Sequence, residues 1–183
     1  MGFRLSDTTE VVLENVRVPR SAVIGEVGCG MSIALNALNL SRAFISTLAV
    51  GIMQRALDEA VAYAKQRKQF GRRLIDFEMV QAMLADMAIK TEAARVLVNN
   101  CMRQMDAGEM VRKDGAIVKT FVTDAMQEVV SNAVQVLGGY GYSEEYPVEK
   151  LMRDAKIFQI FEGTNEIQRV VISGNVIRKN KIK

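Results

Sequence analysis

The sequence predicts an all-α fold, an antiparallel four-helix bundle with a short β segment at its N-terminus. Two observations lead to this prediction. Apolar residues recur at helical spacing from Met31 to Asn180, and glycine or proline marks most breaks between the helical stretches. The chain has 183 residues, 49% of them hydrophobic and 25% charged, so it can bury one substantial core. We therefore expect one helical domain over 27–183, preceded by a separate segment over 1–26.

The N-terminal segment has the pattern of a strand rather than of a helix. In Thr8 to Val18 apolar residues are separated by other residues, several of them polar, and Pro19 closes the run. This pattern predicts one or two short strands. Gly25, Gly28 and Gly30 then form a flexible joint, where we place the domain boundary.

Three long helices follow the joint. The first runs from Met31 to Gln66, about 36 residues or roughly 54 Å, and Phe70-Gly71 breaks its pattern. The second is expected from near Asp76 to near Gly108, and the third from about Val111 to Leu137. The loops between the helices are mostly short, which favours antiparallel neighbours.

Two shorter helices complete the chain. Pro147 suits the first turn of a helix that ends near Ala155, because proline fits the first helical position. Thr164 is a candidate N-cap for a last helix that ends at about Asn180.

Composition excludes several kinds of site. The chain has no histidine, which removes histidine triads and two-histidine zinc motifs. Cys29 and Cys101 lie far apart, so we expect neither a disulfide framework nor a metal site, and a reduced intracellular protein. A net charge of +3 gives no argument for nucleic acid. Arg42 lies in the apolar run Met31–Met53 and argues against a membrane span, and Met1–Arg20 lacks the apolar core of a signal peptide.

Glu162 is the best candidate for an acid or base. It follows the apolar run Ile157–Phe161 and precedes Gly163-Thr164, where a helix can begin. A poorly solvated carboxylate binds a proton more readily than a solvated one, and this suits a general base. The alternative is a loop carboxylate near a helix N-terminus, where the helix dipole mildly favours negative charge. The residues alone leave both interpretations open.

Four segments carry a resemblance to a known family. They read RKQFG at 67–71, QVLGGYGY at 135–142, YPVEKLMRDAKI at 146–157 and FEGTNEIQR at 161–169. In this order they resemble the acyl-CoA dehydrogenases, flavoproteins that oxidise acyl-CoA thioesters to 2,3-enoyl products. The resemblance covers essentially the whole chain. It implies the C-terminal four-helix domain at 27–183 and, in GFRLSDTTEVVLENVRVP within 1–26, the end of the middle β domain.

The resemblance also implies roles for individual residues. Glu162 falls on the catalytic base, which removes the α-proton while a hydride leaves the β-carbon for flavin N5. In some relatives the base is at the position of Ser41, and serine there supports Glu162. The positions that match FAD contacts are Arg67, Gln69, Phe70, Gln135, Gly138, Gly139, Thr164 and Glu166, of which Gln135, Gly138 and Gly139 match contacts to the FAD of a neighbouring subunit.

The substrate positions are Asn39, Arg42, Phe161 and Gly163, with Asn39 and Arg42 near the CoA portion. Arg42 lies in an otherwise apolar helix, so it needs a polar partner in any case. This chain departs from the family where Asn39 replaces a frequent aspartate, Phe161 a common tyrosine and Glu78 a frequent glutamine. These departures leave the acyl chain of the substrate open.

The resemblance further implies an acyl-CoA substrate, electron-transfer flavoprotein or a similar acceptor, and a homodimer or homotetramer. The location would be the bacterial cytoplasm or the mitochondrial matrix. Two alternatives stay open. One is oxidase chemistry on the same scaffold, in which oxygen reoxidises the flavin. The other is a self-associating helical domain without catalysis, because much of the FAD-binding part would lie outside this sequence.

Overall fold

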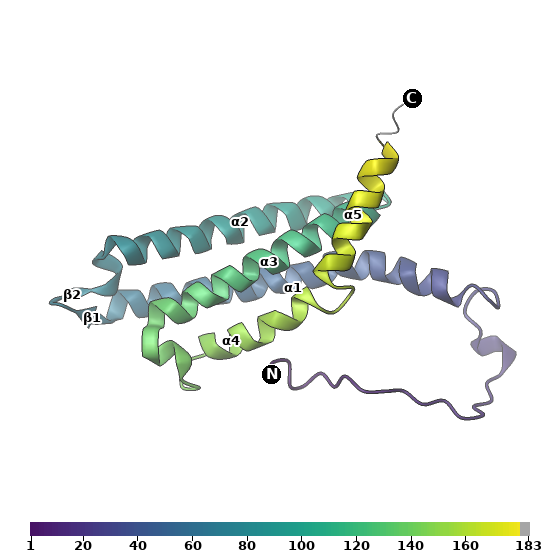
Figure 1. Cartoon of the computed structure of the whole chain (residues 1–183), viewed down its shortest axis with the longest axis horizontal. Helices are drawn as coiled ribbons and strands as arrows, with labels where there is room; N and C mark the ends of the chain where they lie inside the picture. Colours follow the sequence, from purple (N-terminus) through teal and green to yellow (C-terminus); the bar gives the residue numbers. More distant parts are fainter. Residues whose placement is uncertain (180–183) are drawn as a thin grey trace.

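The computed structural model describes residues 1–179, and most of them are helical (Figure 1). The helices are α1 (Gly30–Gln66), α2 (Glu78–Asp106), α3 (Arg112–Leu137), α4 (Val148–Ala155) and α5 (Asn165–Lys179). The all-α fold class is therefore confirmed. The predicted ends lie within about two residues of those observed, as is usual for helix ends; the predicted end at Asn180 lies outside the described residues.

The bundle is built around α3, which contacts α1, α2, α4 and α5. Consecutive helices from α1 to α4 run in opposite directions (Figure 1). The face of α1 toward the core carries mainly small residues, which let the helix axes approach closely, and α3 packs larger ones against them. The fully buried members include Ala49, Met53, Ala56, Ala60 and Ala64 of α1, with Val122, Met126, Val129 and Ala133 of α3.

The strand expected within Thr8 to Val18 does not form. These residues follow an extended path along the outside of the bundle, and Val11, Leu13 and Val18 are exposed (Figure 1). A strand needs a neighbour that completes its hydrogen bonds, and no other described segment pairs with this one. Within the described residues the only sheet is the hairpin of β1 (Lys68–Gln69) and β2 (Arg72–Arg73).

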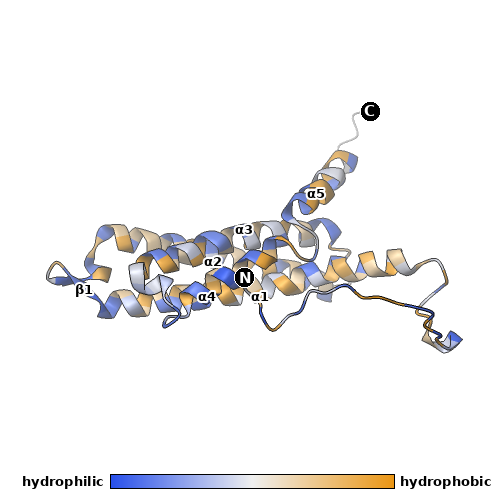
Figure 2. Cartoon of the chain, turned by 60° about the horizontal axis from the view of Figure 1, so that its bottom comes forward, coloured by the Kyte–Doolittle hydropathy of each residue, from blue (hydrophilic) through white to orange (hydrophobic). Residues whose placement is uncertain are grey.

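Two helical segments extend beyond the bundle. Residues 30–37 of α1 are exposed. Helix α5 packs near the N-terminal end of α3 and points away from the bundle at a steep angle (Figures 1 and 2). Apolar side chains are exposed on both, among them Met31 on α1 and Val170 and Ile177 on α5. By length and composition alone α1 is apolar enough to cross a membrane. Its buried residues nevertheless begin at Arg42 and belong to the bundle core.

The N-terminus folds back onto α4 and the segment after it. The Phe3 amide donates to Asp154 Oδ1 at 2.6 Å. The Phe3 ring packs edge-on against Phe158 and Phe161, with centroid distances of 5.5 and 6.5 Å. Phe158 and Phe161 are themselves 5.0 Å apart. This aromatic cluster fixes the polypeptide just before Glu162.

Phe158 is the buried centre of that cluster, with 0% of its side chain exposed. We expect Phe158→Ala to lower the free energy of unfolding by about 3–5 kcal/mol, because it removes the ring and leaves a cavity. Urea unfolding of this chain measures the change. The matched control is Phe121→Ala, whose ring is 41% exposed, and for which we expect less than about 1 kcal/mol. Equal losses in the two variants would contradict the packing described here.

Candidate functional site

Glu162 and Gly163 form a tight turn between the 3-10 helix Lys156–Gln159 and α5. Both have left-handed backbone conformations, with φ of +57° at Glu162 and +88° at Gly163. A Cβ at Gly163 would lie 2.6 Å from Nε2 of Gln168, so glycine is needed there. Left-handed residues other than glycine are uncommon and cluster at functional sites. The backbone at Glu162 therefore marks this turn as a candidate functional site.

The carbonyl groups of the turn point into the protein, onto donors from three helices. Arg42 Nε of α1 donates to the Glu162 carbonyl at 3.3 Å. Gln168 Nε2 of α5 donates to the carbonyls of Glu162 at 3.3 Å and Gly163 at 2.9 Å. Lys119 Nζ of α3 donates to the Gly163 carbonyl at 2.9 Å. Two buried cations and a buried amide thus hold the turn.

The carboxylate of Glu162 faces α1. Ser41 Oγ donates to Glu162 Oε2 at 2.5 Å. Arg42 is 6% exposed, and its Nη1 also donates to Asn39 Oδ1 at 2.9 Å. Burial lowers the pKa of Arg42, Arg112 lowers it further, and Glu162 opposes the shift. The structure therefore brings together the predicted residues Asn39, Arg42, Glu162 and Gly163, and it gives Arg42 the polar partners that its place in an apolar helix required.

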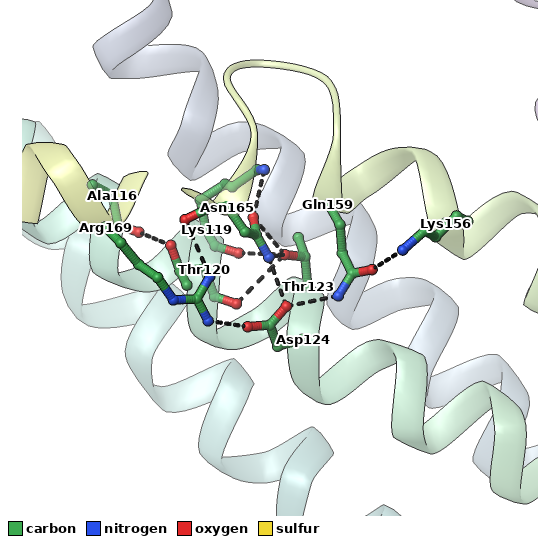
Figure 3. A network of polar contacts seen from close by, with 9 residues as sticks. All are labelled: Ala116, Lys119, Thr120, Thr123, Asp124, Lys156, Gln159, Asn165 and Arg169. Carbon is green, nitrogen blue, oxygen red and sulfur yellow. Dashed lines mark hydrogen bonds and ion pairs between the residues drawn. The ribbon is translucent and has the colours of Figure 1, made fainter. Parts of the chain in front are cut away.

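A polar network that sequence reasoning missed lies behind the turn (Figure 3). Lys119 Nζ donates to Asn165 Oδ1 at 2.6 Å, and Asn165 Nδ2 donates to Asp124 Oδ1 at 2.7 Å. Gln159 Nε2 also donates to Asp124 Oδ1, and Arg169 Nη2 donates to Asp124 Oδ2 at 2.8 Å. The network joins α3 to the segments on both sides of Glu162.

Burial and hydrogen bonding shift the pKa values of two charged groups in this network. Burial lowers the pKa of Lys119 from 10.5 to about 8, although Asp124 and Glu166 act in the opposite direction. Burial would raise the pKa of Asp124, but hydrogen bonds from Arg169 and Gln159 hold it below its usual value. One signal in the sequence could have revealed Lys119. It lies between Ala116 and Thr123 at helical spacing, on a side of α3 that is apolar or weakly polar.

The start of α5 follows the prediction for Thr164. The Ile167 amide donates to Thr164 Oγ1 at 3.3 Å, so Thr164 is the N-cap. Glu166 lies in the first turn of the helix and is exposed. Phe161 is half-buried in the aromatic cluster. All three residues lie beside the Glu162 turn.

A second group of predicted residues lies at the opposite end of α1. Phe70 and Gly71 form the two-residue loop of the β hairpin, with φ of +53° and +78°. Phe70 is 92% exposed, an unusual position for an aromatic ring. The Arg67 guanidinium lies 5.5 Å from the centre of the Tyr140 ring, so the hairpin and the glycine-rich segment adjoin. Gln69 is exposed on the same hairpin.

The glycine-rich segment leaves open space at this end. Gly138 ends α3 with φ +60° and ψ −137°, a conformation that suits glycine. A Cβ at Gly139 would meet nothing within 4 Å, so packing inside this chain does not require glycine there. Gln135, one turn earlier on α3, is exposed. The surface beside Arg67 is therefore accessible to another molecule.

The two groups are far apart within one chain. Ser41 and Arg67 are separated by 26 residues of nearly continuous helix, a distance of about 39 Å at the rise of an α-helix. The two groups of one chain therefore do not form a single compact site.

Comparison with known proteins identifies the fold and the order of these segments. Residues 28–177 match the profile of the family domain described as "Acyl-CoA dehydrogenase, C-terminal domain". The chain belongs to the acyl-CoA dehydrogenase family. The members of this family are flavoproteins, and the helices and turns described above are those of its C-terminal domain.

Three relatives illustrate the range of the family. The chain is 49% identical over 179 residues to the probable acyl-CoA dehydrogenase FadE25 of Mycobacterium tuberculosis, covering 97% of this chain and 46% of that one. It is 42% identical to the caffeyl-CoA reductase-Etf complex subunit CarC of Acetobacterium woodii, covering 98% and 47%. The structure of butyryl-CoA dehydrogenase from Megasphaera elsdenii superposes with a TM-score of 0.89 at 46% identity, covering 91% and 44%. The chain thus spans about half the length of these relatives.

The burial of the Lys119 ammonium predicts how the free energy of unfolding depends on pH. The pKa of Lys119 is about 8 in the folded chain against 10.5 ordinarily. Between these values the unfolded chain binds a proton that the folded chain has released, so the free energy of unfolding rises with pH. Lys119→Met lacks this contribution. We expect the stability of the wild type relative to Lys119→Met to increase from pH 8 to pH 10.5 in urea titrations. A difference that is flat or falls over this range would contradict the assignment.

Proposed function

We propose that this chain supplies the catalytic base and part of the cofactor site of an FAD-dependent acyl-CoA dehydrogenase. The observation that carries the proposal is the turn at Glu162 and Gly163. The Glu162 side chain accepts a hydrogen bond from Ser41 of α1, and the carbonyls of the turn accept hydrogen bonds from α1, α3 and α5. Glu162 removes the proton from the α-carbon of the thioester. The weak acidity of such a proton is the reason that a positioned base is needed.

The geometry suits a base that must not move. Ser41 fixes Oε2 of Glu162, and Oε1 accepts no hydrogen bond from the described residues. The left-handed backbone at Glu162 directs the carboxylate toward α1 and keeps the carbonyl turned inward. Phe161 directly precedes Glu162 in the chain, and Asn39 lies on α1 two residues before Ser41; both would line the place of the substrate. Arg42 supports the same region from the protein interior, because it donates a hydrogen bond to the Glu162 carbonyl.

The donor set at the other end of α1 fits the phosphates and rings of FAD. Arg67 is suited to a pyrophosphate, the exposed ring of Phe70 to an apolar contact, and the open backbone at Gly139 to a close approach. Near Glu162, Thr164 and Glu166 would hold the flavin part of FAD. When bound, FAD accepts the hydride that leaves the β-carbon as Glu162 takes the α-proton.

The 39 Å separation along α1 supports a site shared by two copies of the chain. Glu162, Thr164 and Glu166 of one copy would meet the FAD whose other parts contact Arg67, Gln69, Phe70, Gln135, Gly138 and Gly139 of the next. A homodimer or a homotetramer satisfies this arrangement. The exposed apolar side chains of α1 and α5 are consistent with further contacts in such an assembly.

The electron acceptor that we propose is electron-transfer flavoprotein or a similar protein, because the relative CarC is named as a subunit of an Etf complex.

The name of CarC, a caffeyl-CoA reductase subunit, favours a second candidate function, reduction of an unsaturated acyl-CoA. The residues would then work in reverse, with Glu162 delivering the proton to the α-carbon. Assays with saturated and with unsaturated thioesters separate the two directions, and reoxidation by oxygen against an artificial acceptor tests oxidase chemistry.

The role of Glu162 is tested by Glu162→Gln in a complete enzyme that contains this sequence. Glutamine keeps the volume and the hydrogen bond to Ser41 but does not accept the proton at a useful rate. We expect folding and FAD content to be nearly unchanged and flavin reduction by acyl-CoA to slow by at least ~10²–10⁴-fold, the usual contribution of a general base. Stopped-flow bleaching of the flavin measures this rate. A loss of less than about tenfold would show that Glu162 is not the base.

Ser41→Glu in the Glu162→Gln background is the companion experiment. The Ser41 side chain lies 2.5 Å from the Glu162 carboxylate, so a carboxylate introduced on α1 can face the same substrate carbon. We expect partial recovery of the rate of flavin reduction. Ser41→Gln in the same background is the control, because it adds a side chain of similar size without a base. Equal rates for the two double variants would contradict a shared position.

The shared site is tested with mixed oligomers of Arg67→Met and Glu162→Gln, carrying different tags and purified through both. Each variant alone is expected to have little activity. In a mixed dimer one site takes both intact residues, so we expect about half of the wild-type rate, as closed two-fold symmetry requires. No recovery in the mixed species would mean that Arg67 and Glu162 act within one chain, and a wild-type rate for Arg67→Met alone would mean that Arg67 does not serve the cofactor.

A further inference from the structure

We propose that Lys119 is a positioning residue for the catalytic turn, holding the Glu162 carboxylate in place through the Gly163 carbonyl. This inference rests on the proposed function, because it concerns the same base. Lys119 itself does not touch the carboxylate: its ammonium group donates to the Gly163 carbonyl at 2.9 Å and to Asn165 Oδ1 at 2.6 Å. It therefore contacts the residues one and three positions after the base.

Lys119 is fully buried and hydrogen-bonded, so its contact with the turn belongs to the folded core and is not a chance surface contact. The side chain is 0% exposed, although it belongs to the most hydrated class of residues. Burying a charge is unfavourable unless it is paired and hydrogen-bonded. Here Asn165 links the ammonium to the Asp124 carboxylate, which also receives Arg169 (Figure 3). The negative charge of Asp124 therefore reaches the Lys119 ammonium only through Asn165, and the ammonium remains free to donate to the Gly163 carbonyl.

The helix that carries Lys119 explains why this contact matters. Gln168 also donates to the turn, but it belongs to α5, which begins only two residues after Gly163 and diverges from the bundle (Figure 1). Its hydrogen bonds keep the turn in shape without fixing where the turn lies. Lys119 comes from α3, the helix that contacts every other helix. Together with Arg42 of α1, it ties the turn to the rigid part of the molecule.

Loss of this tie would displace the base rather than unfold the protein. The Gly163 carbonyl keeps Gln168 as a donor when Lys119 is replaced by methionine, a side chain of similar length that fills the same space. A misplacement of about 1 Å at a reacting group can slow a reaction by ~10²-fold. We therefore expect Lys119→Met to reduce the rate of proton removal while the affinity for substrate changes little.

The experiment uses a complete enzyme that contains this sequence, with the acyl-CoA thioester that reduces the wild-type flavin. We expect Lys119→Met to slow flavin reduction by ~10–10²-fold, with FAD content retained and the dissociation constant for the thioester within about threefold, a change of less than 1 kcal/mol. Lys113→Met is the matched control. It removes a lysine from the same helix that pairs with Asp114 and has no bond to the turn, and we expect the wild-type rate.

A double-mutant cycle with Glu162→Gln separates positioning from general damage. If Lys119 acts through the Glu162 carboxylate, Lys119→Met causes no further loss once that carboxylate is gone. Hydrogen–deuterium exchange of peptides spanning 160–166 gives a readout apart from activity. We expect faster exchange there in Lys119→Met and unchanged exchange in the core of α1 to α3.

The outcomes are distinct. A wild-type enzyme whose flavin no acyl-CoA thioester reduces, or a Glu162→Gln variant with a normal rate, overturns the proposed function. With both of those as expected, a rate for Lys119→Met within threefold of wild type, or losses that add to those of Glu162→Gln, overturns the role of Lys119. Lys119→Gln, which keeps a neutral donor, is made if Lys119→Met does not fold. If neither variant folds, Lys119 maintains the fold and the positioning proposal is wrong.

Discussion

The structure depends on satisfying the carbonyl groups of one sharp turn. Two consecutive left-handed residues, Glu162 and Gly163, turn their carbonyls away from water, and an unpaired buried carbonyl would be unfavourable. Arg42, Lys119 and Gln168 supply the missing donors. Each of these polar residues is buried. Their hydrogen bonds to the turn explain why polar side chains interrupt the apolar core beside Glu162.

The positions of the long helices could be predicted because they follow from local chemistry. Apolar spacing, the glycine at 138 and the N-cap at Thr164 are properties of short stretches, and α1, α3 and α5 begin close to where they were expected. The strand at Thr8 to Val18 could not be judged in this way. A strand exists only with a partner, and its alternating pattern describes side chains suited to a sheet rather than a sheet that this chain can complete.

The same distinction between local patterns and tertiary contacts applies to the residues of the site. Arg42 was predictable in kind, since an arginine in an apolar helix must find a partner, but the identity of that partner was not. The Glu162 carbonyl lies 120 positions away in the sequence. Lys119 and Asp124 were missed because their meaning arises only when α3 packs beside the start of α5 and Asn165 bridges them. Periodicity identifies a buried face, whereas a network between helices depends on tertiary structure.

The length of α1 connects the two parts of the site. One end of the helix carries Ser41 and Arg42 to the base, and the other carries Arg67 and the hairpin with its exposed ring. The continuous helix, 37 residues long, keeps these two groups about 39 Å apart in one chain. Under the proposed function, a second copy of the chain would bring the hairpin end of its own α1 to the Glu162 turn. Assembly and catalysis would then depend on the same helix: a change at Arg67 alters the site of a neighbouring copy, while a change at Lys119 or Glu162 affects the copy that carries it.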